Sequence, residues 1–171
     1  MANRRRRERW VDIPGFPLYA VSDMGRVMNK HSDHIKIATL NQAGIPNVLL
    51  VADGEQHRRS VAVLVAHAFL DEPPMLWNAT PINLDGDRTN NAADNLEWRP
   101  RWFATRYHQQ FRRGAAYGFT GGVQHIQTGE IFEDVRDAAL KFGLLEDDII
   151  ISAHTNTPVF PSWDEFQLLP Q

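Results

Sequence analysis

The side chains best suited to chemistry gather in one polar stretch, PINLDGDRTNNAADNLEW, from Pro81 to Trp98. Asp85 and Asp87 carry carboxylates, whose hard oxygens suit a divalent cation such as magnesium. We expect these side chains to form turns by bonding their own backbone instead. Metal-assisted hydrolysis also needs a group that takes a proton from water, and histidine is the usual choice. The stretch contains no histidine, and the nearest along the chain are His67 and His108. Hydrolysis here would therefore need a base from outside the stretch.

A buried helix is expected before this stretch. Residues 60–70 (SVAVLVAHAFL) are apolar on most faces and rich in alanine and leucine, which favours helix over strand. We expect His67 to be a packed residue of this helix, with one hydrogen bond satisfied, and not a catalytic one.

An amphipathic helix is expected after the stretch, within residues 99–113 (RPRWFATRYHQQFRR). Phe103, Tyr107 and Phe111 recur every four residues, which predicts one aromatic stripe packed in a core. The arginines of the segment fall mostly off this stripe, and their density could serve a phosphate backbone. They are Arg101, Arg106, Arg112 and Arg113.

Small antiparallel strands are predicted for residues 10–58, an N-terminal β module that follows a basic arm at residues 1–9. Turn signals at Pro14-Gly15 and Asp23-Met24-Gly25 separate short apolar runs. Further strand candidates are residues 35–40, residues 48–51 and a stretch after residue 54. Residues 59–113 then form the central module.

The C-terminal part is predicted to be a ribbon with helices, spanning residues 123–171 after a glycine-rich linker at 114–122. The alternation around Thr128-Gly129 predicts a two-stranded ribbon, and residues 133–144 predict a short helix that stops near Gly143. The segment EDDIIISAH that follows fits either a helix or a strand. We expect Trp163 and Phe166 in the tail to close over this module, and the whole fold to be α+β.

Composition indicates a folded protein of a reducing compartment. Hydrophobic residues make up 43% of the 171 residues, enough for a packed core, and the absence of cysteine excludes disulfides and thiolate zinc sites. No apolar run reaches the length of a membrane span, and the N-terminus lacks the apolar core of a signal peptide. We therefore expect no membrane partner and a cytoplasmic location.

Charge is divided unevenly along the chain. Residues 1–113 carry 16 Lys and Arg against 12 Asp and Glu, whereas residues 114–171 carry 2 against 9. The excess of basic residues in residues 1–113 attracts a phosphate backbone, whereas the excess of acidic residues in residues 114–171 repels it. If nucleic acid binds, we expect it to bind the first part.

Several stretches resemble one family, the phage HNH homing endonucleases. ERWVDIPGFPLYAVSDMGRV resembles their NUMOD-type N-terminal module, with its pattern IPGFP.Y.VSD.GRV after a tryptophan. LVAHAFL resembles the LVA.AF helix that precedes the HNH motif, and LDGDRTNNAADNLEW is similar to the motif body IDGNKTNN..NLEW. Residues 121–163 resemble, more weakly, a C-terminal helix-turn-helix-like repeat with the pattern TGE.F.S...AA..LG. The resemblance implies an HNH-like ββα-metal core.

The resemblance also implies where the family's reaction centre would lie. The general-base position, a histidine in the family, falls on Asn83, and the metal-ligand positions fall on Ile82 and Ala104. Of the four motif positions only the structural asparagine, Asn95, is retained. An amide does not titrate near neutral pH, and alkyl side chains offer no lone pair to a cation. The motif is therefore degenerate, and we predict no catalytic residue, no bound metal and no cofactor.

Three hypotheses for function follow. The first is a catalytically inactive, phage-encoded protein that binds duplex DNA. The second is a virion structural or protein-interaction subunit, a homo-oligomer included, with the acidic C-terminal residues at its rim: Glu146, Asp147, Asp148, Asp164 and Glu165. The third is an active nicking enzyme that uses magnesium or manganese at a relocated site around Asp85, His67 and His108.

Under the first hypothesis, arginines hold the phosphates of duplex DNA. They come from the basic arm and from the helix of residues 99–113: Arg4, Arg5, Arg6, Arg7, Arg99, Arg101, Arg106, Arg112 and Arg113.

Overall fold

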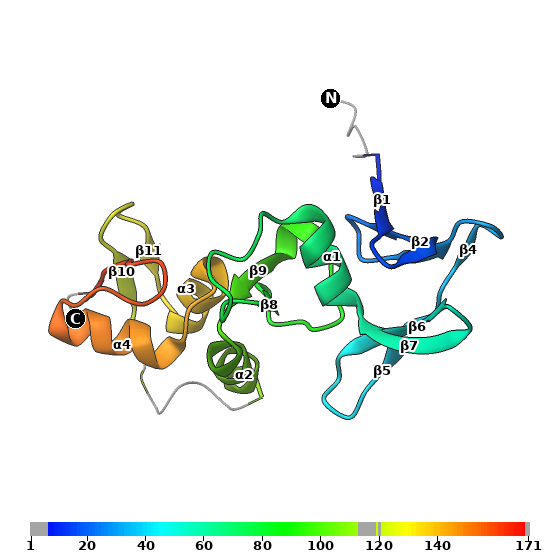
Figure 1. The fold of residues 1–171 in the computed structure, drawn as a ribbon. Coiled ribbons are helices and arrows are strands. Elements are labelled where there is room, and N and C mark those ends of the chain that lie inside the picture. Colours follow the sequence, from blue (N-terminus) through cyan, green and yellow to red (C-terminus); the bar gives the residue numbers. More distant parts are fainter. Residues whose placement is uncertain (1–6, 113–118, 120, 170–171) are drawn as a thin grey trace. The chain divides into compact units, whose positions relative to one another are not determined.

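The chain folds into two compact units, each built from short strands and helices (Figure 1). The computed structural model describes residues 7–112, 119 and 121–169. The first unit contains the chain up to Asn83 together with Asp87–Pro100, and the second contains Leu84–Gly86 together with the chain from Arg101 onward. The predicted α+β class is confirmed. Six of the nine residues of the predicted linker lie outside the described residues, and the module boundaries stay predictions.

Two small antiparallel sheets form the N-terminal part of the first unit (Figure 1). One has the order β1-β2-β3-β4 and the other the order β5-β6-β7. Residues 35–40, expected as one strand, are divided between β4 and β5, because the chain leaves one sheet and enters the other there. The strands are β1 (Trp10–Ile13), β2 (Phe16–Ser22), β3 (Val27–Asn29), β4 (His34–Ile35), β5 (Thr39–Leu40), β6 (Pro46–Ala52) and β7 (Glu55–Ser60).

Helix α1 (Val61–Phe69) packs against this part, as its apolar sequence predicts. Val65 and Ala66 are fully buried in a core that also contains Leu50. The prediction that His67 is packed was wrong. The residue is exposed, because α1 buries one stripe of side chains and His67 lies outside that stripe. Its ring lies against the ring of Trp98, with 5.1 Å between centroids.

A two-stranded hairpin completes the first unit. Strand β8 (Thr80–Asn83) pairs antiparallel with β9 (Leu96–Arg99), so that Asn83 lies opposite Leu96. A 3₁₀ turn, η1 (Ala93–Asn95), leads into β9. The indole Nε1 of Trp98 donates to the carbonyl of Asp71, 2.9 Å away, which ties β9 to the segment after α1.

The second unit joins helix α2 (Arg101–Gln110) to a three-stranded sheet and two further helices (Figure 1). The predicted ribbon is β10 (Val123–His125) with β11 (Ile131–Phe132), and β12 (Phe166–Leu168) adds a third strand on the other side of β10. The two helices are α3 (Val135–Phe142) and α4 (Glu146–Thr155), so EDDIIISAH is helical.

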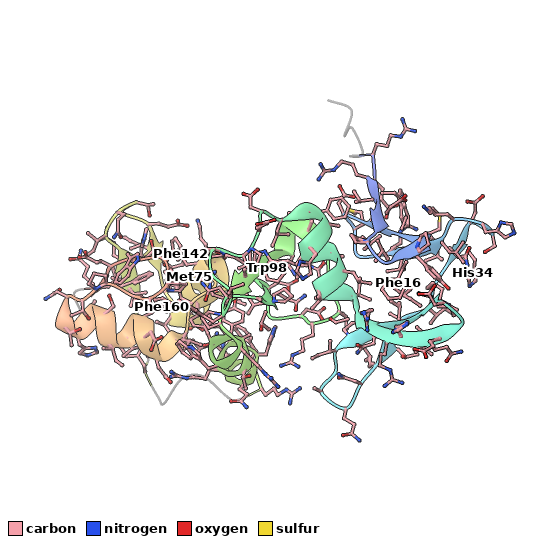
Figure 2. The ribbon with its side chains drawn as sticks, viewed as in Figure 1. Phe16, His34, Met75, Trp98, Phe142 and Phe160 are labelled. Carbon is pink, nitrogen blue, oxygen red and sulfur yellow. The ribbon has the colours of Figure 1, made fainter. Side chains whose placement is uncertain are left out.

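The core of the second unit follows the predicted apolar faces. Ala138 and Ala139 of α3 and Phe166 of β12 are fully buried, and Phe142, labelled in Figure 2, packs against them. Gly143 ends α3 in a left-handed conformation, with φ of 61°. The prediction that Trp163 closes over the core was wrong. Its side chain is exposed, because the turn that carries it directs the side chain outward.

No helix among the described residues is long and apolar enough to cross a membrane.

Candidate functional site

Asn83, the residue at the general-base position of the motif, is a buried hydrogen-bond donor at the end of β8. Only 3% of the surface of Asn83 is exposed. Nδ2 donates to the carbonyl of Asn90 over 2.8 Å and to Oδ1 of Asn91 over 3.1 Å. Both amide hydrogens therefore bind the loop that follows β8. A group that donates both hydrogens inward is a structural tie and has no free lone pair on that nitrogen to accept a proton.

Asn95 binds the same carbonyl from the other end of the loop. Its Nδ2 donates to the carbonyl of Asn90 over 2.8 Å, so this oxygen accepts hydrogen bonds from Asn95 and from Asn83. We call Asn83, Asn90, Asn91 and Asn95 the amide cluster. It ties the loop between β8 and β9 together through amide groups, none of which has the titrating nitrogen of an imidazole.

The aspartates of the loop form turns. Oδ1 of Asp87 accepts from the hydroxyl of Thr89 at 2.7 Å and from its backbone N–H at 2.8 Å. These bonds, the side-chain one first, lower the pKa of Asp87 from its ordinary value of 3.8. Asp85 is exposed on the same loop. An aspartate that binds the backbone two residues ahead shapes a turn.

The metal-ligand positions do not fit a divalent cation. Ile82 is fully buried in β8, and Ala104 is buried on α2 in the second unit. Neither side chain carries an oxygen or nitrogen. Among residues 7–112, 119 and 121–169, no three His, Asp or Glu side chains gather where they could hold a metal ion. His108 is buried on α2, and His67 is exposed on α1 of the other unit.

The N-terminal part supports the loop directly, which sequence reasoning missed. The backbone N–H of Ala93 donates to the carbonyl of Asp23 over 2.9 Å. Gly25, with φ of 79°, lies so close to Asn91 that an added Cβ would be 3.0 Å from its backbone. Glycine is needed there for both reasons. The turn signal Asp23-Met24-Gly25 was visible in the sequence, but the partner of the turn was not.

Helix α2 holds the short segment Leu84–Gly86 within the second unit. The hydroxyl of Tyr107 donates to the carbonyl of Leu84 over 2.7 Å. Gly86 has φ of 75°, and an added Cβ would lie 2.7 Å from the ring of Phe111. The aromatic stripe predicted for α2 therefore also positions the first residues of the loop.

Replacement of Asn83 is expected to destabilise the loop, because the new side chain cannot donate the two hydrogen bonds of Nδ2. Asn83→Ala should lower the free energy of unfolding by about 1–3 kcal/mol, because buried acceptors lose their donors. Asn83→Asp should cost more, since a carboxylate would face two oxygens. Chemical denaturation of the full chain measures both.

Asn41→Asp is the matched control. Oδ1 of Asn41 accepts from the N–H groups of Ala43 and Ile45, so aspartate retains both bonds. We expect a change within about 0.5 kcal/mol. Equal losses for Asn83→Asp and Asn41→Asp would contradict the donor role of Asn83.

The arginines expected to bind DNA occupy different environments. Arg7 is exposed before β1, and Arg101, Arg106 and Arg112 are exposed on or directly after α2. Arg99 is only 3% exposed, and its Nη1 binds the carbonyl of Trp98 and the carboxylate of Glu97. Its place in β9 of a packed hairpin argues against contact with a phosphate. Arg4, Arg5, Arg6 and Arg113 lie outside the described residues.

The end of the basic arm is fixed by ion pairs to the first unit. Nε of Arg9 donates to the buried carboxylate of Asp23 over 3.0 Å, and the backbone N–H of Arg9 donates to the same group. Arg26 pairs with Glu8. The charges of Glu8 and Arg9 at the end of the arm thus serve the fold, whereas Arg7 is exposed.

Most acidic residues of the second unit have basic or hydrogen-bonding partners. Glu146 is buried and accepts from Nε of Arg136 at 2.7 Å, and Glu130 pairs with Lys141 at 2.6 Å. Asp147 lies 3.7 Å from Arg106. Of these basic partners, Arg136 and Lys141 already count in the charge of residues 114–171, and Arg106 adds one positive charge from outside that segment.

Asp148 on α4 carries the one raised carboxyl pKa resolved among the described residues. Burial raises this pKa from 3.8 and Asp147 adds to the shift, while Arg106 opposes it. A folded-state pKa above the unfolded value means that stability falls as pH rises through that interval. The variant Asp148→Asn should thus gain stability relative to the wild type as pH rises above 3.8. Thermal unfolding across this pH range tests it, and a constant difference would contradict it.

Parts of the chain are similar to known proteins. Residues 8–50 match the NUMOD4 motif. An uncharacterised HNH endonuclease of Acanthamoeba polyphaga mimivirus is 32% identical over 97 residues, which are 55% of this chain and 24% of that protein. The chain thus aligns with about a quarter of the length of this relative.

A solved structure shares the fold. It is described as DNA binding and cleavage by the HNH homing endonuclease I-HmuI, and it matches with a TM-score of 0.52 and 20% identity over 95% of this chain and 99% of that one. Parts of the chain are thus similar to the NUMOD4 motif and to a viral HNH endonuclease, and its fold is shared with an HNH homing endonuclease.

Proposed function

We propose that this protein is a catalytically inactive member of the HNH homing-endonuclease family and that it binds duplex DNA. The observation that carries the inactivity is the amide of Asn83, which stands at the general-base position and donates both hydrogens to the loop. The buried alkyl side chains of Ile82 and Ala104 support the same conclusion for the metal. A scaffold held by the amide cluster and lacking a base is suited to binding without hydrolysis.

The exposed face of α2 is the proposed contact with the DNA backbone. Arg101 begins α2 and Arg112 lies two residues beyond its end, so the two exposed guanidinium groups belong to opposite ends of the helix. Arg106 adds a third exposed guanidinium nearby. Guanidinium groups that contact phosphates fix position and orientation without reading sequence. The binding should therefore show little sequence preference.

Titration of a fluorescent duplex with the full chain tests the proposal. We expect binding at low ionic strength that weakens steeply with salt, as counterion release requires. Duplexes of unrelated sequence should bind with similar affinity. Absence of binding at low salt would exclude this function.

A protein-interaction role is the second candidate, and one observation favours it. In the first unit, Met75, Leu76 and Trp77 form an exposed apolar run after two prolines, and Leu76 is 97% exposed. Exposed apolar patches often mark protein contacts. Native mass spectrometry tests self-association: a stable oligomer that Leu76→Ser dissociates would favour this candidate over DNA binding.

A further inference from the structure

Three large aromatic side chains of the second unit are exposed and contact one another. Trp102 of α2 is 53% exposed, Phe160 is 41% exposed and Trp163 is 67% exposed. The rings of Trp102 and Phe160 are 6.3 Å apart between centroids and inclined by 22°, and those of Phe160 and Trp163 are 6.5 Å apart. We call these three residues the aromatic row; Phe160 is labelled in Figure 2. They present ring faces and edges to solvent that the unit does not bury.

The turn that carries Trp163 holds its side chain outward. Trp163 has φ of 62°, a conformation that bulky residues rarely adopt. Its backbone N–H donates to the carbonyl of Val159 over 2.8 Å, and Val159 N–H donates to the carbonyl of Asp164 over 2.8 Å. The turn is therefore preorganised, with the ring of Trp163 exposed without a ligand.

The charged side chain next to this turn is directed inward. The carboxylate of Asp164 accepts from the hydroxyl of Ser162 and lies 3.0 Å from Nε2 of the buried His125. Nδ1 of His125 in turn lies 2.7 Å from the hydroxyl of Thr128. The carboxylate is thus engaged in the packing of the turn, which leaves the ring of Trp163 as the exposed group.

The cations beside the row suit a phosphodiester chain. Arg101 directly precedes Trp102 and is exposed. Arg106 follows one helical turn later and is paired with Asp147, whose carboxylate lies 3.7 Å away. Aromatic rings that adjoin exposed arginines are the arrangement by which proteins bind single-stranded nucleic acid, because bases stack on the rings while guanidinium groups hold phosphates. Paired bases inside a duplex are already stacked and offer no free face.

We propose that the aromatic row is a stacking platform for unpaired bases of DNA. The inference deepens the proposed DNA binding and rests on it: α2 would hold the backbone of a duplex segment, and the row would hold bases that leave the stack. The ligand class is single-stranded DNA or a locally opened duplex.

The test compares a thymidine oligomer with a duplex of equal length, both titrated with the full chain. Trp102→Ala and Trp163→Ala should each weaken binding of the oligomer about tenfold, the effect expected for loss of one stacked base. Affinity for a fully paired duplex should fall less than oligomer affinity, because its stacked bases offer no free face. Trp102→Phe should restore oligomer binding, since a smaller ring still stacks. Trp77→Ala is the matched control, because Trp77 is 66% exposed but belongs to the first unit.

The outcomes separate the two proposals. Duplex binding with oligomer affinity unchanged in both alanine variants overturns the stacking platform alone. Equal weakening by Trp77→Ala also overturns it, because the effect would then follow exposed apolar surface in general. A dimer that the alanine variants dissociate without change in oligomer affinity would make the row an interface between copies and overturn it too. Failure of both duplex and oligomer to bind would overturn the proposed function as well.

Discussion

Supercoiled plasmid incubated with the purified protein and magnesium or manganese is expected to stay supercoiled. A general base alone contributes about 10²–10⁴-fold to the rate of such reactions. Asn83 cannot replace it, because its amide nitrogen donates to Asn90 and Asn91 and does not titrate near neutral pH. The cation contributes further, and Ile82 and Ala104 provide no ligand for it. Gel electrophoresis of nicked and linear forms measures the result.

The variants His67→Ala and His108→Ala distinguish a relocated site from contamination. Nicking that requires the metal and disappears in either variant would show that a different base operates, and the proposed inactivity would be wrong. Nicking that persists equally in both variants and in Asn83→Ala would come from a contaminating nuclease. Asn83→His alone should not restore cleavage, because the two metal-ligand positions would still be alkyl.

The double variant Arg101→Ala with Arg112→Ala is expected to lose much of the salt dependence of duplex binding. Each phosphate neutralised on B-DNA contributes about −0.9 to the slope of log affinity against log salt. Two lost contacts should therefore reduce the slope by about 1.8 and weaken binding at low salt. Fluorescence anisotropy of a labelled duplex at several salt concentrations gives the slope.

The single variants Arg101→Ala and Arg58→Ala form a matched pair. Both remove one exposed arginine, but Arg58 lies on β7 in the first unit. Arg101→Ala should reduce the slope by about 0.9, and Arg58→Ala should leave it unchanged. Equal reductions would show that binding follows net charge and does not use the face of α2.

The proposed loss of catalytic chemistry rests on the sequence, because it depends on which side chain occupies a motif position. No packing gives an amide the pKa of an imidazole. The helical periods of α2 and α3, the stop at Gly143 and the turn residues of the loop are also local properties. They depend on residues a few positions apart, so they follow from the sequence without any tertiary contact.

The role of each polar group depended on contacts between distant residues. Arg99 and Arg101 are neighbours of the same type, yet the first is buried in β9 and the second is exposed on α2. Trp163 is exposed and Phe166 fully buried, because pairing of β12 with β10 and the turn at Val159 place them in opposite environments. The sequence by itself determined that the matched motif positions carry an amide and two alkyl side chains. Only the tertiary structure decided that Asn83 serves as a double donor and which cations and rings face solvent, because burial and hydrogen-bond partners arise from residues that meet only in the folded chain.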